Sequence, residues 1–156
     1  MFIKLFAGAI AFVAAIVFAG TSGLTFYVWP TGLGDAKLIV TPEVVQRLRV
    51  LHAEHKFGPD RLTFYPGTAS EEQRAVAQAA VDATIQSLIT ELPARPQRST
   101  VLRVLKATLT KFDSAESEER DQLLSYLTKA MDICGVESSS ELFNVWRYGF
   151  PYGWFL

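Results

Sequence analysis

Apolar residues after position 40 recur at steps of three and four, the spacing that places side chains on one face of a helix. Three such series occur: Val44, Leu48 and Leu51; Val101, Leu105, Leu109 and Phe112; and Leu123, Leu124, Leu127, Met131 and Cys134. No stretch alternates polar and apolar positions for long enough to form a sheet. The pattern therefore predicts a chain of helices.

Start signals divide this pattern into separate helices. Thr41 precedes Pro42 and Glu43, and this order predicts a start because proline fits the first turn and an acid suits the helix dipole there. The first helix is expected to end near Lys56. Two further starts are predicted by capping boxes, in which a serine precedes Gln73 or Glu141 by three residues; the serines are Ser70 and Ser138.

The helix after Ser70 is expected to be long and rich in alanine. Its inward face is predicted to comprise Val76, Ala80, Ala83, Leu88 and Leu92. Ser99 or Thr100 opens the next helix, and residues 113–121 form an acidic loop and first helical turn. Gly135 is the expected cap of the helix that follows.

One short extended segment is expected near residues 62–65, closed by a turn at Pro66 and Gly67. The predicted fold is therefore mainly α. It is a small bundle of about five helices after an N-terminal transmembrane or signal-anchor helix.

Residues 1–29 differ from the rest of the chain. From Leu5 to Trp29 there are 25 residues without a charge, and a helix of that length reaches roughly 37 Å, enough to cross the hydrocarbon core. Tyr27 and Trp29 suit an interfacial aromatic belt, and Pro30 ends the helix. These features predict an anchor that contacts membrane lipid through residues 5–29.

Two other interpretations of this segment remain open. It could be a cleaved signal peptide, with Lys4 as its basic part and cleavage near Ser22, or a buried helix of a soluble protein. Residues 1–29 hold no cysteine, which excludes a lipoprotein anchor at a processed N-terminus. The expected location is the inner membrane, with a single span and a periplasmic domain. Secretion to the periplasm after cleavage and a cytoplasmic-facing domain are the alternatives, the latter because basic residues follow the segment.

The predicted organisation is an anchor or signal at 1–29, a linker at 30–40, a helical domain at 41–150 and an aromatic tail at 151–156. The chain carries 15 Lys and Arg against 16 Asp and Glu. This balance argues against nucleic acid as a partner, because binding phosphates needs clustered positive charge. The single Cys134 excludes an intramolecular disulfide.

The chain shows no catalytic constellation. His52 and His55 could meet on one helix face, but a third ligand is missing and the spacing is not that of the metalloprotease helix. Cys134 lies in an apolar series and is interpreted as core packing. We therefore expect no metal, no cofactor and no enzymatic activity.

Partner binding is the expected role. Aromatic residues gather in the last eleven positions, where interfaces are often enriched in them. The acidic residues 116–121 are a solvated helix start or a docking surface for a basic partner. The candidate partner-binding residues are Tyr65, Asp132, Glu137, Trp146, Arg147, Tyr148, Tyr152 and Trp154.

Four ordered motifs carry a family resemblance: Leu62-Thr63-Phe64-Tyr65-Pro66-Gly67, Phe112-Asp113, Ala130-Met131-Asp132-Ile133-Cys134-Gly135-Val136-Glu137-Ser138-Ser139 and Asn144-Val145-Trp146-Arg147-Tyr148-Gly149-Phe150. Together they resemble the bacterial domain of unknown function 4844, over about Thr41 to Phe150. The resemblance implies a small, mainly helical bacterial domain with no established activity. It supplies no functional residues.

The leading hypothesis is a membrane-anchored helical binding or inhibitor domain, for which an immunity-type protein of the bacterial envelope is one form. A second hypothesis is an enzyme with a cryptic site built on Asp132, Glu137 and Arg147, whose charges flank apolar motif residues. A third is a structural envelope protein that oligomerises through its leader and tail.

Overall fold

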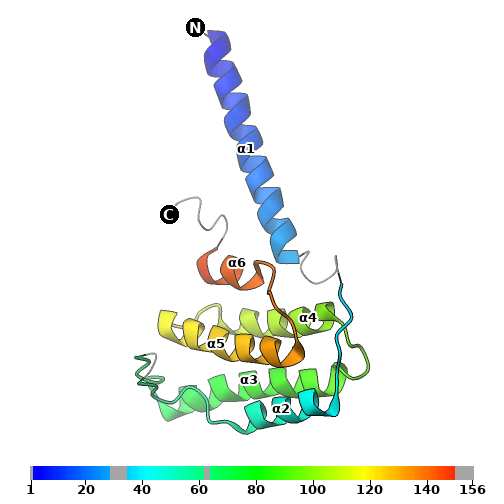
Figure 1. Ribbon diagram of the computed structural model, residues 1–156. Coiled ribbons are helices and arrows are strands. Elements are labelled where there is room, and N and C mark those ends of the chain that lie inside the picture. Colours follow the sequence, from blue (N-terminus) through cyan, green and yellow to red (C-terminus); the bar gives the residue numbers. More distant parts are fainter. Residues whose placement is uncertain (1, 29–34, 62–63, 150–156) are drawn as a thin grey trace. The chain divides into compact units, whose positions relative to one another are not determined.

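The structure is a computed structural model that describes residues 2–28, 35–61 and 64–149 (Figure 1). Its elements are α1 (Phe2–Val28), α2 (Pro42–Ala53), α3 (Glu71–Glu91), α4 (Arg98–Leu109), the 3-10 turn η2 (Thr110–Phe112), α5 (Ser117–Cys134) and α6 (Leu142–Tyr148). Over these ranges the chain is helical apart from isolated bridges, and the mainly α prediction is confirmed.

The chain forms two compact units. Residues 31–139 make up one unit, which contains α2 to α5. Residues 1–30 and 140–156 make up the other, in which α6 contacts α1. The last helix, expected within the helical domain, is therefore grouped with the N-terminal helix.

The unit of residues 31–139 is a four-helix bundle. Each of α2, α3, α4 and α5 contacts two neighbours in a closed ring, and α3 and α5 also meet across the diagonal (Figure 1). The predicted inward face of α4 is confirmed, as is that of α5 except at Leu124, which is half-buried; on α2, Leu48 and Leu51 are buried as predicted and Val44 is half-buried. The buried residues that line this core include Leu48, Leu51, Val101, Leu105, Leu109, Phe112, Leu123, Leu127, Met131 and Cys134.

In the first part of α3 the inward face lies one position away from the predicted one. Val76 is 68 % exposed, while its neighbour Ala77 is buried. Leu88 and Leu92 are buried as expected, but Ala83 is exposed. The prediction was wrong here because alanines line several sides of this helix, so apolarity alone does not distinguish its faces. The buried set is Ala77, Val81, Thr84, Ile85, Leu88 and Leu92.

Two of the predicted helix ends are confirmed. The backbone N–H of Gln73 donates to Ser70 Oγ at 3.1 Å, as a capping serine requires. Gly135 ends α5 with φ of +75°, in the left-handed region that favours glycine.

The capping box at Ser138 and Glu141 is wrong. Ser140 and Glu141 have φ of +47° and +71°, so the backbone is left-handed where the box needs a helical turn. The last helix therefore starts at Leu142, and Glu141 accepts a hydrogen bond from Asn144 Nδ2 at 2.9 Å instead.

An extended segment was expected near residues 62–65. Of these, the structure describes Phe64 and Tyr65, and they belong to a tight loop. Phe64 has φ of +56°, which is not extended, and the backbone N–H of Asp60 donates to the Tyr65 carbonyl at 2.8 Å. This bond folds the chain back on itself within six residues. Leu62 and Thr63 lie outside the described residues.

The described part of the predicted linker is tied to the bundle. Leu38 N–H donates to the Pro96 carbonyl at 2.7 Å, and Arg98 N–H donates to the Ala36 carbonyl at 2.9 Å. Asp35 accepts from both the backbone N–H and the hydroxyl of Ser99, at 2.8 and 2.7 Å. Asp35 thus caps the start of α4 from a distant part of the chain, and residues 35–38 are not a free linker.

Among the residues that the structure describes, no helix is long and apolar enough to cross a membrane. The transmembrane or signal-anchor segment at residues 1–29 stays a prediction. Trp29, expected in an aromatic belt, lies outside the described residues.

Candidate functional site

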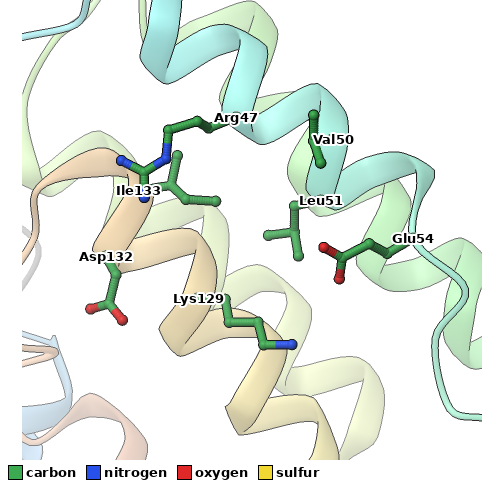
Figure 2. A pocket seen from close by; sticks show the side chains of 7 residues that line it. All are labelled: Arg47, Val50, Leu51, Glu54, Lys129, Asp132 and Ile133. Carbon is green, nitrogen blue, oxygen red and sulfur yellow. The ribbon is translucent and has the colours of Figure 1, made fainter.

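A groove of about 360 Å³ lies between α2 and α5 (Figure 2). We call it the α2–α5 groove, and its lining residues are Arg47, Val50, Leu51, Glu54, Lys129, Asp132 and Ile133. A second hollow of about 410 Å³ shares Arg47, Asp132 and Ile133 with it and extends past Ile39 and Gly135. The two hollows form one continuous surface, in which the start of α2 meets the end of α5.

The centre of the groove is apolar and open. Leu51 is 2 % exposed and belongs to the core, while Ile133 is half-buried. Val50 lines the groove from α2 and is 55 % exposed. In the adjoining hollow, Ile39 is 85 % exposed. Apolar surface of this kind favours contact with another molecule.

Four exposed charges surround this apolar centre. Arg47 and Asp132 lie toward one end of the groove, and Glu54 and Lys129 lie toward the other (Figure 2). Lys129 Nζ is 5.5 Å from the centroid of the Tyr126 ring. In the described part of the chain, none of the four side chains forms an ion pair. Their charges therefore face solvent, where a partner could meet them.

A buried lysine fixes the Glu54 end of the groove. Lys56 has no exposed surface, and its ammonium donates to the carbonyls of His52 and Glu54 at 3.0 and 2.9 Å and to Asp82 Oδ1 at 2.7 Å. These bonds satisfy carbonyls at the end of α2 and join them to α3. They also explain why α2 ends at Ala53 and not near Lys56 as predicted.

Tyr126 stabilises the α5 side of the groove through hydrogen bonds and a ring contact. Its hydroxyl accepts from the backbone N–H of Phe57 at 3.0 Å and from Gln122 Nε2 at 3.2 Å. The Phe57 ring meets Tyr126 edge-on and stacks on Phe112, with centroids 5.2 and 6.0 Å apart. Phe57 has φ of +58°, a conformation that costs energy and that this packing holds in place.

The residues predicted from sequence are distributed over several places. Asp132 lines the α2–α5 groove, whereas Glu137 is exposed outside it. Tyr65 is buried, and its hydroxyl has no hydrogen-bond partner among the described residues. Burial, followed by the nearby charge of Glu119, raises the pKa of Tyr65 to about 12.

The candidates on α6 belong to the other unit. Trp146 is buried and Tyr148 is 64 % exposed, with the Arg147 guanidinium 5.4 Å from the Tyr148 ring centroid. Tyr152 and Trp154 lie outside the described residues. Arg147 is not in the same unit as Asp132 and Glu137, so neither unit by itself contains the proposed cryptic catalytic set.

The surroundings of His55 and Cys134 indicate structural roles for these two residues. His55 Nδ1 lies 3.5 Å from a guanidinium nitrogen of Arg74. Within the described residues, no group of three or more His, Cys, Asp or Glu side chains could hold a metal ion. Cys134 is buried, as interpreted from its apolar series, and burial raises its pKa to about 12.

Four groove residues were not singled out from the sequence: Arg47, Val50, Glu54 and Lys129. The charged members resemble ordinary solvent-facing positions of a helix. Val50 carries the one available signal, because it is apolar yet lies off the face defined by Val44, Leu48 and Leu51.

Comparison with known proteins supports both the fold and the family. A solved DUF3571 family protein from Acinetobacter baumannii is similar in structure, with a TM-score of 0.63 and 28 % sequence identity, over 69 % of this chain and 89 % of that one. No curated protein matches the chain. The family model for the domain of unknown function DUF4844 matches residues 40–151, and the chain therefore belongs to this family.

Proposed function

We propose that this protein is a membrane-held helical binding protein whose partner surface is the α2–α5 groove. The observation that carries the proposal is a groove lined by apolar residues, among them the exposed Val50, and by four charges that lack ion-pair partners among the described residues. An apolar centre within a polar rim is the usual anatomy of a protein–protein interface.

Attachment to the bacterial inner membrane is proposed through residues 5–29, which carry no charge. Six large apolar side chains on α1 are more than half exposed, and at about 100° per residue they cover roughly two thirds of the way round the helix. Each would gain roughly 1.5–3 kcal/mol on leaving water. These side chains are Ile10, Phe12, Val13, Ile16, Val17 and Phe18.

Site-specific photocrosslinking tests the binding surface. A photoreactive residue replaces Val50 in the full chain, in intact bacteria, and Val76 serves as the control because it is an exposed valine on α3, away from the groove. We expect a protein adduct from position 50 and none from position 76. Equal yields at the two positions, or no adduct at either, would refute the groove as the partner surface.

Alkaline extraction tests the membrane part separately. The full chain should stay with the membrane pellet at high pH, and a chain that begins at residue 31 should be released. Recovery of the full chain in the soluble fraction would rule out attachment through residues 5–29.

An immunity-type role is one form of this proposal. Deletion of the gene should then make the bacterium sensitive to a toxin from a neighbouring strain, and restoration of the full chain should remove that sensitivity. Unchanged survival in competition with such strains would exclude this form and leave the binding surface to be tested by crosslinking.

A further inference from the structure

The four charges of the α2–α5 groove alternate in sign around its apolar centre. Along α2 the positive Arg47 comes first and the negative Glu54 last. Across the groove, Asp132 lies at the Arg47 end and Lys129 at the Glu54 end (Figure 2). Each corner of the groove therefore differs in sign from the next corner, both along a helix and across the groove.

Such an arrangement is complementary to itself. A twofold axis that crosses the helices would place α2 against α2 of a second copy, so that Arg47 meets Glu54 and Lys129 meets Asp132. A twofold axis parallel to the helices would place α2 against α5, so that Arg47 meets Asp132 and Glu54 meets Lys129. In both cases each of the four charges faces an opposite charge, and each contact is made twice.

We propose that the α2–α5 groove is a self-association surface and that its partner is a second copy of this chain. This inference rests on the proposed function, in which the groove is the binding surface. A partner of one charge sign would meet repulsion at two of the four corners, whereas a second copy satisfies all four. Val50, which lines the groove and is exposed, would be covered by the second copy.

Charge reversal with rescue tests the proposal in the full chain, in detergent, with sedimentation equilibrium as the readout. Arg47→Glu places a carboxylate against a carboxylate in both copies, and we expect dimerisation to weaken by about tenfold or more. Arg49→Glu is the matched control, because Arg49 is exposed on the same helix and does not line the groove. It should dimerise like the original chain.

A second reversal identifies the axis. If α2 faces α2, adding Glu54→Arg to Arg47→Glu restores dimerisation, and adding Asp132→Arg does not. If α2 faces α5, the rescue pattern is the opposite. All these side chains are exposed, so helical content by circular dichroism should be unchanged in every variant.

The outcomes separate this inference from the proposed function. Weakening by Arg47→Glu and rescue by one second reversal support both. A monomeric chain whose Val50 crosslinks to a different protein overturns self-association and keeps the groove as a binding surface. A dimer unaffected by Arg47→Glu overturns self-association through the groove, and the absence of any Val50 adduct overturns both.

Discussion

The ammonium nitrogen of Lys56 lies 2.7 Å from a carboxylate oxygen of Asp82, with the lysine side chain fully buried and the aspartate side chain 21 % exposed. The same ammonium binds two carbonyls at the end of α2. This one cation therefore both ends a helix and joins it to α3.

Lys56→Met should destabilise the protein by about 3–5 kcal/mol, because it leaves a partly buried carboxylate and two carbonyls without their donor. Arg103→Met is the control, since Arg103 pairs with Glu91 at an exposed site and its loss should cost less than about 1 kcal/mol. Urea unfolding followed by circular dichroism measures both. Equal losses would show that the buried pair contributes no more than a surface one.

Asp35→Ala should lower the free energy of unfolding by about 1 kcal/mol, because the backbone N–H of Ser99 loses its capping acceptor. Asp35→Asn keeps an acceptor oxygen and should retain most of the stability. Hydrogen exchange at the start of α4 locates the effect. Faster exchange there in the alanine variant, but not in the asparagine variant, is the expected result; similar exchange in both would argue against a cap.

Tyr126→Phe should cost about 1–3 kcal/mol, because the buried N–H of Phe57 then has no acceptor. Tyr148→Phe is the comparison, since that ring is exposed and the loss of its hydroxyl should change stability by less than about 0.5 kcal/mol. Thermal or urea unfolding distinguishes the two variants. A Tyr126→Phe protein as stable as the Tyr148→Phe protein would contradict the assigned hydrogen bond.

Alkaline pH should destabilise the protein through Cys134. Burial raises the pKa of this thiol from 9.0 to about 12 in the folded protein. Below pH 9 the thiol is protonated in both states and its contribution is fully present. Between pH 9 and 12 the unfolded chain loses the proton first, so stability falls, by at most about 1.4 kcal/mol per pH unit.

The measurement for this prediction is the free energy of unfolding between pH 8 and pH 10, compared with a Cys134→Ala variant. The variant is expected to be less stable at pH 8 because of its cavity, but to lose less stability as the pH rises. Parallel curves for the two proteins would refute a raised thiol pKa. The thiol should also react slowly with a disulfide reagent until the protein unfolds.

Gly135→Ala should destabilise the protein by roughly 1–2 kcal/mol because the backbone there has φ of +75°, while an added Cβ would meet no atom within 4 Å. Gly58→Ala is the control, since it also has open space and no positive φ. Comparable stability of the two variants would show that backbone conformation does not require glycine at the end of α5.

The inward faces of α4 and α5 could be predicted from sequence because large apolar residues alternate with clearly polar ones. On α3 the contrast is lost: Val76 is exposed and Ala77 is buried, and only the packing of neighbouring helices decides between them. The left-handed backbone at Ser140 and Glu141 could not be predicted either, because both residues also suit a helix start.

Of the residues that line the α2–α5 groove, only Asp132 was among the candidate partner-binding residues predicted from sequence. A groove is formed by residues from two helices far apart in sequence, and Glu54 and Lys129 become neighbours only after α2 and α5 pack together. The burial of Lys56 could not be predicted from sequence either. A lysine after a helix is usually solvated, and its acceptor Asp82 is 26 residues away.

The attachment of residues 35–38 to the loop before α4 has a mechanical consequence. Tension applied along the N-terminal part of the chain would reach the bonds of Asp35 to Ser99, in the first turn of α4, and the bridge at Lys37 and Gln97 before it reached α2. Those bonds would carry the load first, and the groove between α2 and α5 would feel it only after they had broken.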